Sequence, residues 1–178
     1  MSISTHITKI SSGAFDHLHN IKRISKYLSK RSLTILIHAF VTSRLDYCNG
    51  LLYGLPNCQL SKLLRIQNDA ARLVTNSHRW HNATPILSSL HWLPVKFRID
   101  FKILLMVFKC LHGISPTYLS DLITVRTLRP YNLRSTDGVL LAYPNGKMLP
   151  TLGSRAFYSA APTLWNNLPT EIRNVNTQ

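Results

Sequence analysis

CQLSKLLRIQNDAARLVTN, residues 58–76, is the stretch that decides the fold class of this 178-residue chain. Its apolar, small and amide side chains recur every three or four positions, which is the spacing of one face of an α-helix. Lys62, Arg65 and Arg72 lie on the opposite side, and Asp69 is within one turn of both arginines, close enough for weak ion pairs. The face consists of Leu60, Leu63, Leu64, Gln67, Ala70, Ala71 and Val74. This stretch therefore predicts an amphipathic helix.

Upstream, the same spacing predicts two further helices. The first covers residues near 5–29. Ser32 is expected to cap the second, which runs toward Cys48 and stops in the breaker-rich stretch 50–56. The apolar faces are Ile7, Ile10, Ala14, Leu18, Ile21 and Leu28 in the first helix and Leu33, Leu36, Ile37, Phe40 and Val41 in the second.

Downstream, a polar connection at 76–84 leads into a short helix that begins at Pro85 with Thr84 as its cap. Pro94 is expected to open the next helix, which Gly113 ends, and a short helix follows at 116–123. The helix after Pro94 has the strongest apolar face in the chain. That face consists of Phe97, Phe101, Leu104, Leu105, Phe108 and Leu111.

Beyond Val125, prolines and glycines interrupt the chain every few residues. A short strand at 139–143 and a last helix near 154–166 fit between them. The sequence thus predicts a mostly α fold, a helical bundle of about five to six helices. We expect a helical region at 1–123 and an irregular C-terminal extension at 124–178 with a short helix and at most a short strand or hairpin.

The charge of the chain indicates a polyanionic partner. The sequence contains 21 Lys and Arg but only seven Asp and Glu, for a net charge of +14. Its 45% apolar content is enough for a core and excludes a disordered basic tail. Such an excess attracts nucleic acid or anionic lipid, and a charge that only maintains solubility is the alternative.

Catalysis and metal binding find little support in the sequence. The closest acidic residues, Asp121 and Asp137, are 16 positions apart, so a carboxylate cluster for acid–base or two-metal chemistry is difficult to build. His78 and His81 form one close pair and Cys110 and His112 another, but the two pairs are at least 29 positions apart, which does not suit a zinc site. The nucleophile and phosphate-loop motifs GxSxG, GxGxxG and GxxxxGK do not occur. We therefore predict no catalytic residue, no metal and no cofactor.

Other sequence features bear on the compartment. Three cysteines without CxxC spacing argue against a disulfide framework and favour an intracellular location, nuclear or cytoplasmic. Residues 1–30 lack the apolar core of a signal peptide. The longest aliphatic or aromatic run, 103–108, is far shorter than the ~18 residues of a membrane span, so we expect no membrane partner.

Two basic patches are candidate nucleic-acid contacts, because cations neutralise phosphates while aromatic rings stack on bases. The first crowds one helix end and consists of Lys22, Arg23, Lys26, Lys30 and Arg31, with Tyr27 among them. The second is a loop that holds His78, Arg79, Trp80 and His81. The ordinary alternatives are a solvated helix face for the first patch and a Trp80 side chain tucked into the core for the second.

Arg44 is a further candidate with two interpretations. It follows Phe40 and Val41 by one turn and so lies at the edge of an apolar face. It can contact a phosphate, or it can be partly buried and paired with a backbone carbonyl or a distant Asp. The sequence favours the second interpretation.

Several segments together resemble the polyprotein of non-LTR (LINE-type) retrotransposons. They are HAFVTSRLDYCN at 38–49, YGLP at 53–56, IQNDAARLV at 66–74, LHWLPV at 90–95, RAF at 155–157 and APTLWNNLP at 161–169. Their order and spacing also match, and the resemblance covers nearly the whole chain.

The resemblance implies the region downstream of the reverse transcriptase palm, a helical thumb followed by a C-terminal extension. The family's polymerase chemistry uses a Tyr-x-Asp-Asp turn and a further Asp that bind two Mg²⁺ ions. This sequence contains no Asp-Asp pair, so no catalytic residue carries over. We expect a truncated, non-catalytic fragment that retains sequence-tolerant binding to RNA or an RNA–DNA hybrid.

A second hypothesis has no nucleic-acid role. It makes the chain a helical protein-interaction module or a non-functional remnant, whose apolar faces at 33–55 and 94–111 bind another protein or cause self-association.

Overall fold

The computed structural model describes residues 3–126, 139–144 and 153–173. Within these ranges 73% of the residues are helical and no strand forms, which confirms the predicted mostly α fold. The chain divides into two compact units, Met1–Ile99 and Asp100–Gln178. The predicted change of character after residue 123 falls inside the second unit, and the predicted domains 1–123 and 124–178 stay a prediction.

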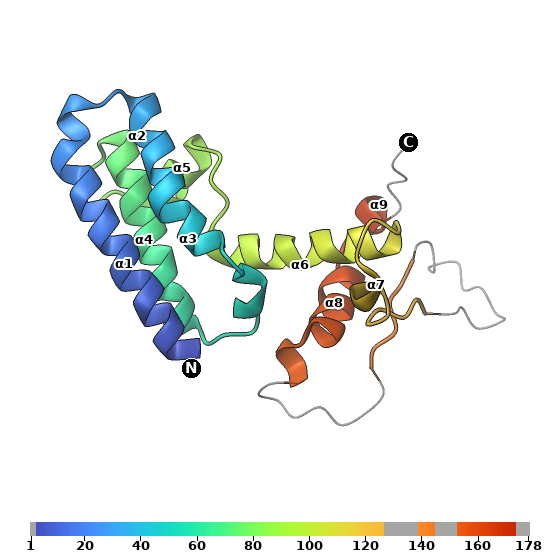
Figure 1. Ribbon diagram of the computed structural model, residues 1–178. Helices are drawn as coiled ribbons and strands as arrows, with labels where there is room; N and C mark the ends of the chain where they lie inside the picture. Colours follow the sequence, from blue (N-terminus) through green and yellow to red (C-terminus); the bar gives the residue numbers. More distant parts are fainter. Residues whose placement is uncertain (1–2, 127–138, 145–152, 174–178) are drawn as a thin grey trace. The chain divides into compact units, whose positions relative to one another are not determined.

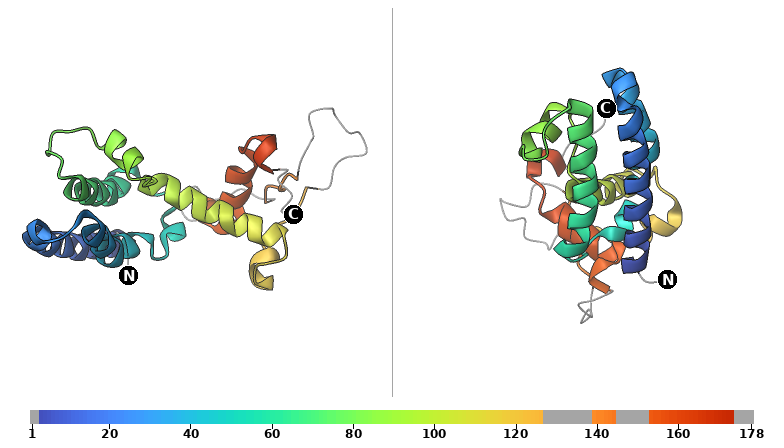
Figure 2. Two further views of the ribbon diagram at one scale, coloured as in Figure 1. Left: turned by 90° about the horizontal axis from the view of Figure 1, so that it is seen from above. Right: turned by 90° about the vertical axis from the view of Figure 1, so that its left-hand side faces the viewer.

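Three helical rods form the body of the first unit (Figure 1). α1 (Ile3–Ile24) and α4 (Asn57–Thr75) lie side by side and run in the same direction, as Figure 2 also shows. α2 (Lys30–Ile37) and α3 (Ser43–Asp46) form the antiparallel rod between them in sequence. The predicted faces of α1 and α4 supply much of the core, with Ile7, Ala14, Leu18, Ile21, Leu63, Gln67, Ala70, Ala71 and Val74 buried.

The rod of α2 and α3 is continuous but irregular, with a π-helical turn at His38–Thr42. Its buried residues Leu33, Ile37, Val41 and Leu45 are spaced by four. On a regular α-helix each step of four residues drifts by about 40° around the axis, so this row would leave the core within a few turns. The wider π turn reduces that drift and keeps the row buried.

The two caps predicted for helices in this unit are each displaced. Ser29, not Ser32, caps α2: the Ser29 Oγ accepts a hydrogen bond from the Ser32 backbone N–H at 3.1 Å. α5 (Ala83–Ser89) is capped by Asn82, not Thr84, with 3.1 Å between the Asn82 Oδ1 and the Thr84 N. In both cases the predicted residue lies inside the first turn and donates its backbone N–H to the residue that does cap the helix.

A buried glutamine joins α4 to the turn before α6 (Val95–Leu111). The Gln67 Nε2 donates to the Leu93 carbonyl at 2.8 Å, and its Oε1 accepts from the Val95 N–H at 3.0 Å. Arg98 also donates from Nε to the Leu93 carbonyl at 2.8 Å, and its Nη1 pairs with the Asp46 Oδ2 at 2.7 Å. This network fixes where α6 begins.

The predicted apolar face of α6 is wrong as a core face. Phe97 and Phe101 are 54% and 58% exposed, and the buried row is Val95, Ile99, Ile103 and Val107. The helix carries apolar side chains nearly all round, so spacing alone does not select one face. The boundary between the two units falls inside α6, after Ile99.

Within its described residues, the second unit has short helices and one extended segment. It contains the rest of α6, α7 (Thr117–Ser120), α8 (Phe157–Asn166) and α9 (Thr170–Arg173), the last of which was not predicted. In place of the predicted strand at 139–143, the described residues form an isolated antiparallel bridge between Val125 and Leu141. The expected helix near 154–166 is a 3-10 turn at Gly153–Arg155 followed by α8.

Side chains at the end of α8 hold the extended segment. The Trp165 Nε1 donates to the Val139 carbonyl at 2.9 Å. The Asn166 Oδ1 accepts from the Leu141 N–H and its Nδ2 donates to the Leu141 carbonyl, both at 3.0 Å. Leu141 and Trp165 are buried, so these contacts position part of the core of this unit. None of the helices described in either unit has the length and apolarity that a membrane crossing requires.

Candidate nucleic-acid interface

A cationic hollow of about 670 Å³ lies between α1 and α4. α1 contributes Phe15, Leu18, His19 and Lys22, and α4 contributes Arg65, Asp69, Arg72 and Leu73. Asn76, Ser77 and Arg79, from the loop that follows α4, complete the lining. Because the two helices are parallel, the basic last turn of α1 meets the second half of α4 and this loop.

The α4 side of the hollow is a single row of the helix surface. Arg65, Asp69 and Arg72 are spaced by four and three, so their side chains leave the same face. The sequence placed this face opposite the apolar stripe, with Asp69 close enough to both arginines for weak ion pairs. In the structure it borders the polar side of α1 at Lys22, so cations from both helices converge.

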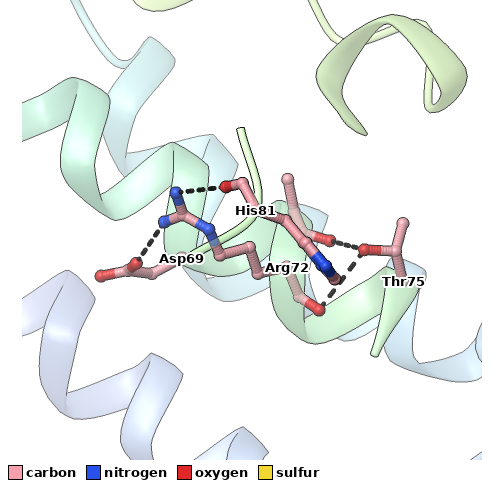
Figure 3. Close-up of polar contacts among 5 residues, drawn as sticks. Asp69, Arg72, Thr75 and His81 are labelled. Carbon is pink, nitrogen blue, oxygen red and sulfur yellow. Dashed lines mark hydrogen bonds and ion pairs between the residues drawn. The ribbon is translucent and has the colours of Figure 1, made fainter. Parts of the chain in front are cut away.

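Arg72 ties the following loop to α4 (Figure 3). Its Nη1 pairs with the Asp69 Oδ1 at 3.1 Å, and its Nη2 donates to the His81 carbonyl at 3.2 Å. The Thr75 hydroxyl lies 3.4 Å from the Arg72 carbonyl. It also lies 2.7 Å from the Ser77 hydroxyl. These bonds hold both ends of the loop that carries Arg79.

The charge of the hollow is strongly positive. Lys22, Arg65, Arg72 and Arg79 line it, and Asp69 is the one acidic residue among the described residues of its lining. Asp69 is engaged by Arg72, while Lys22, Arg65 and Arg79 make no ion pair with any residue that the structure describes. Three lining cations therefore remain available to an anionic ligand, without the cost of breaking an existing pair.

A second hollow of about 440 Å³ continues this surface toward the start of α4. It shares Phe15 and Arg65 with the first and adds Ser11, Cys58, Ser61 and Lys62. We call the two hollows together the α1/α4 groove. Its cations at Lys62, Arg65 and Arg72 are spread over about 15 Å of helix, at ~1.5 Å per residue.

The structure places only part of the predicted site in this groove. Lys22 and Arg79, predicted in separate patches, line the same hollow. Trp80, next to Arg79, is 83% exposed, so the alternative that it tucks into the core is wrong. Arg23 borders a different hollow, together with His17, Ile24 and Phe40.

The remaining predicted residues are exposed but lie outside the lining of the groove. They are Lys26, Lys30, Arg31 and Arg44. The favoured interpretation of Arg44, a partly buried and paired side chain, does not match this exposure, and among the described residues Arg44 forms no ion pair. Its Nη1 instead lies against α1, 3.2 Å from where a Cβ on Gly13 would be. Asp46, two residues after Arg44, is paired with Arg98.

Lys62, Arg65 and Arg72 were not predicted from the sequence as site residues. The available signal was their spacing of three and seven on one helix face, but nothing in the spacing says which helix that face meets. For metal binding, no cluster of three or more His, Cys, Asp or Glu side chains occurs in the part of the chain that the structure describes.

Comparisons with known proteins add no relative: no family model, no curated protein and no solved structure matches the chain.

Proposed function

We propose that the α1/α4 groove binds the sugar–phosphate backbone of RNA or an RNA–DNA hybrid, with little dependence on base sequence. The observation that carries the proposal is the convergence of Lys22, Arg65 and Arg79 on one hollow, with no acidic partner for them among the described residues. Cations that face a ligand rather than a carboxylate release counterions from the nucleic acid on binding, which is the main source of sequence-independent affinity.

The form of the groove also supports this ligand. A groove along two parallel helices suits a linear polyanion better than a compact one, because its cations are spread over about 15 Å of α4. The two serines of this lining add no free donor, because the Ser11 hydroxyl is buried and the Ser61 hydroxyl donates to the Cys58 carbonyl at 2.9 Å. The cations therefore provide the contacts with phosphate oxygens.

The resemblance of the chain to LINE-type retrotransposon polyproteins supports the same proposal from a separate direction. A thumb region contacts the template and primer, so a basic groove on its helices would grip a hybrid. We propose that the chain is such a thumb and post-palm region, and that its role is non-catalytic.

The test is a binding series with a labelled blunt RNA–DNA hybrid at increasing salt. A triple variant with Lys22→Gln, Arg65→Gln and Arg79→Gln should lose roughly tenfold or more in affinity and lower the salt slope by about 2 to 3, about one unit for each phosphate contact removed. A matched control carries Lys9→Gln, Lys96→Gln and Lys102→Gln, which are exposed helical cations outside the groove.

The control removes the same total charge and should keep most of the affinity and the slope. Equal losses for the two triple variants would attribute binding to net charge and reject the groove. A wild-type affinity that does not change between low and moderate salt would reject the electrostatic proposal itself.

A second candidate function, protein interaction, has its own supporting observation. Phe40 and Ile24 are exposed large apolar side chains that border a hollow of about 530 Å³ between α1 and the rod of α2 and α3. If this surface is the functional one, Phe40→Ser should abolish a salt-insensitive self-association at low micromolar concentration and leave hybrid binding unchanged.

A further inference from the structure

The chain contains three tryptophans, and one of them differs sharply from the others. Trp92 and Trp165 are 7% and 4% exposed, whereas Trp80 is 83% exposed. A tryptophan left in water forgoes the largest apolar burial available to any side chain, so its position calls for an explanation.

The loop that carries Trp80 is held in place by hydrogen bonds on both sides of the indole. Before it, the Ser77 N–H donates to the Arg72 carbonyl at 3.0 Å. Around it, the His78 N–H donates to the His81 Nδ1 at 3.2 Å, and the His81 N–H donates to the His78 carbonyl at 3.1 Å. The Arg72 Nη2 then fixes the His81 carbonyl to α4. The indole is thus presented on a constrained turn, so ordering the backbone costs little when a ligand arrives.

The neighbour of Trp80 lines the groove. Arg79 is part of the hollow lining, and the two residues are consecutive. A strand whose phosphates contact Arg79 and Arg65 therefore passes beside the residue that carries this indole, which is too exposed to be part of the core.

We propose that Trp80 stacks on an unpaired base of the strand whose backbone lies in the α1/α4 groove. The preferred ligand is then a nucleic acid with a single-stranded segment rather than a fully paired one. This inference rests on the proposed function, because the groove must hold the backbone for the base to reach the ring. Duplex bases are already stacked on each other, so only an unpaired base can use the indole.

Stacking on an aromatic side chain changes affinity by roughly 5- to 150-fold for each base. This contribution does not depend on neutralising phosphates, so it should separate cleanly from the electrostatic one in a salt series.

The experiment compares two probes, a blunt RNA–DNA hybrid and the same hybrid with a short unpaired overhang on one strand. Wild-type protein should bind the overhang probe at least about fivefold more tightly, with quenching of tryptophan fluorescence. Trp80→Ala should remove the preference and the quenching while it leaves affinity for the blunt hybrid and the salt slope unchanged. Trp80→Phe should retain part of the preference.

Tyr27 supplies the matched control. Its ring is also 83% exposed, and it belongs to the basic first patch, but it does not line the groove. Tyr27→Ala should keep the preference for the overhang. Loss of the preference in Tyr27→Ala but not in Trp80→Ala would overturn the assignment to Trp80.

The outcomes distinguish this inference from the proposed function. If the groove triple variant loses binding but Trp80→Ala binds both probes as wild type does, the groove stands and the stacking inference is rejected. If wild-type protein binds neither probe, both are rejected.

Discussion

Both units of the chain use a carboxamide to hold a distant backbone segment, but they depend on it to different degrees. In the first unit Gln67 bonds the Leu93 carbonyl and the Val95 N–H beneath a bundle whose core is made by apolar helix faces. In the second unit Asn166 bonds both backbone groups of Leu141, which belongs to an extended segment that forms an isolated bridge to Val125. Apolar periodicity thus explains the architecture of the first unit, and side-chain-to-backbone hydrogen bonds explain much of the second.

The largest expected effect breaks the second unit alone. Trp165→Ala removes a buried indole and its bond to the Val139 carbonyl and should lower the free energy of unfolding of that unit by about 3–5 kcal/mol. Hydrogen exchange on the full chain should show this loss in α8 amides and none in α4 amides. Trp80→Ala, the same change at an exposed site, should cost less than about 0.5 kcal/mol. Equal loss of protection in α4 and α8 would mean that the two units unfold together.

The next effect compares the two amides directly. Gln67→Met and Asn166→Leu each leave backbone groups without a partner. Each substitution should lower the free energy of unfolding by about 1–3 kcal/mol. We expect the larger loss for Asn166→Leu, because Leu93 keeps its bond from the Arg98 Nε at 2.8 Å while both groups of Leu141 lose theirs. Urea denaturation measures the free energy of unfolding of both variants. Asn167→Leu, one position later and exposed, is the control, and a larger loss for Gln67→Met would contradict the comparison.

The two units also differ in how much of their fold follows from the sequence. The spans of α1 and α4 and most of their buried residues follow from spacing, because one apolar stripe on each helix leaves one choice of face. Phe97 and Phe101 were misassigned because α6 offers several apolar faces. The hydrogen bonds between Asn166 and Leu141 leave no periodic pattern in the sequence, because they join one side chain to the backbone of a residue 25 positions away.

The candidate site was predictable only in part for a related reason. Lys22 and Arg79 were identified from local crowding of charge, which is visible in the sequence. Arg65 and Arg72 were not, because their role depends on α1 lying parallel to α4. Spacing assigns residues to faces of one helix, and only packing decides which faces meet.

A smaller effect concerns helix caps, which also differ between the units. Ser29 caps α2 through its side chain, whereas Ala156 at the same position of α8 provides no acceptor. Ser29→Ala should lower the free energy of unfolding by about 1 kcal/mol, and Ala156→Ser should raise it by a similar or smaller amount. Thermal denaturation checks both, with Ser32→Ala as the control for the first. A larger loss for Ser32→Ala than for Ser29→Ala would restore the cap predicted from the sequence.

The smallest expected effect concerns the difference in charge between the two units. The first unit has 13 Lys and Arg against three Asp, and the second has eight against four acidic residues. Asp69→Asn removes the acidic residue of the hollow lining and frees Arg72, so affinity for the RNA–DNA hybrid should rise about two- to fourfold. Asp46→Asn, which frees Arg98 outside the groove, is the matched control for titrations at one salt concentration. An equal gain in both variants would indicate that only net charge matters.

The π-helical turn at His38–Thr42 determines where the sequence can lose a residue without disturbing the core. Loss of the codon for Ala39, whose side chain is exposed, would convert the turn to regular α-helix. At about 100° per residue, Leu33, Ile37, Val41 and Leu45 would then fall within an arc of about 60°, still one face. The same loss in the middle of α4 would rotate every later side chain by about 100° and turn Arg72 away from Lys22. Loss of a single residue is therefore tolerable at this turn of the α2 and α3 rod and not in the middle of α4.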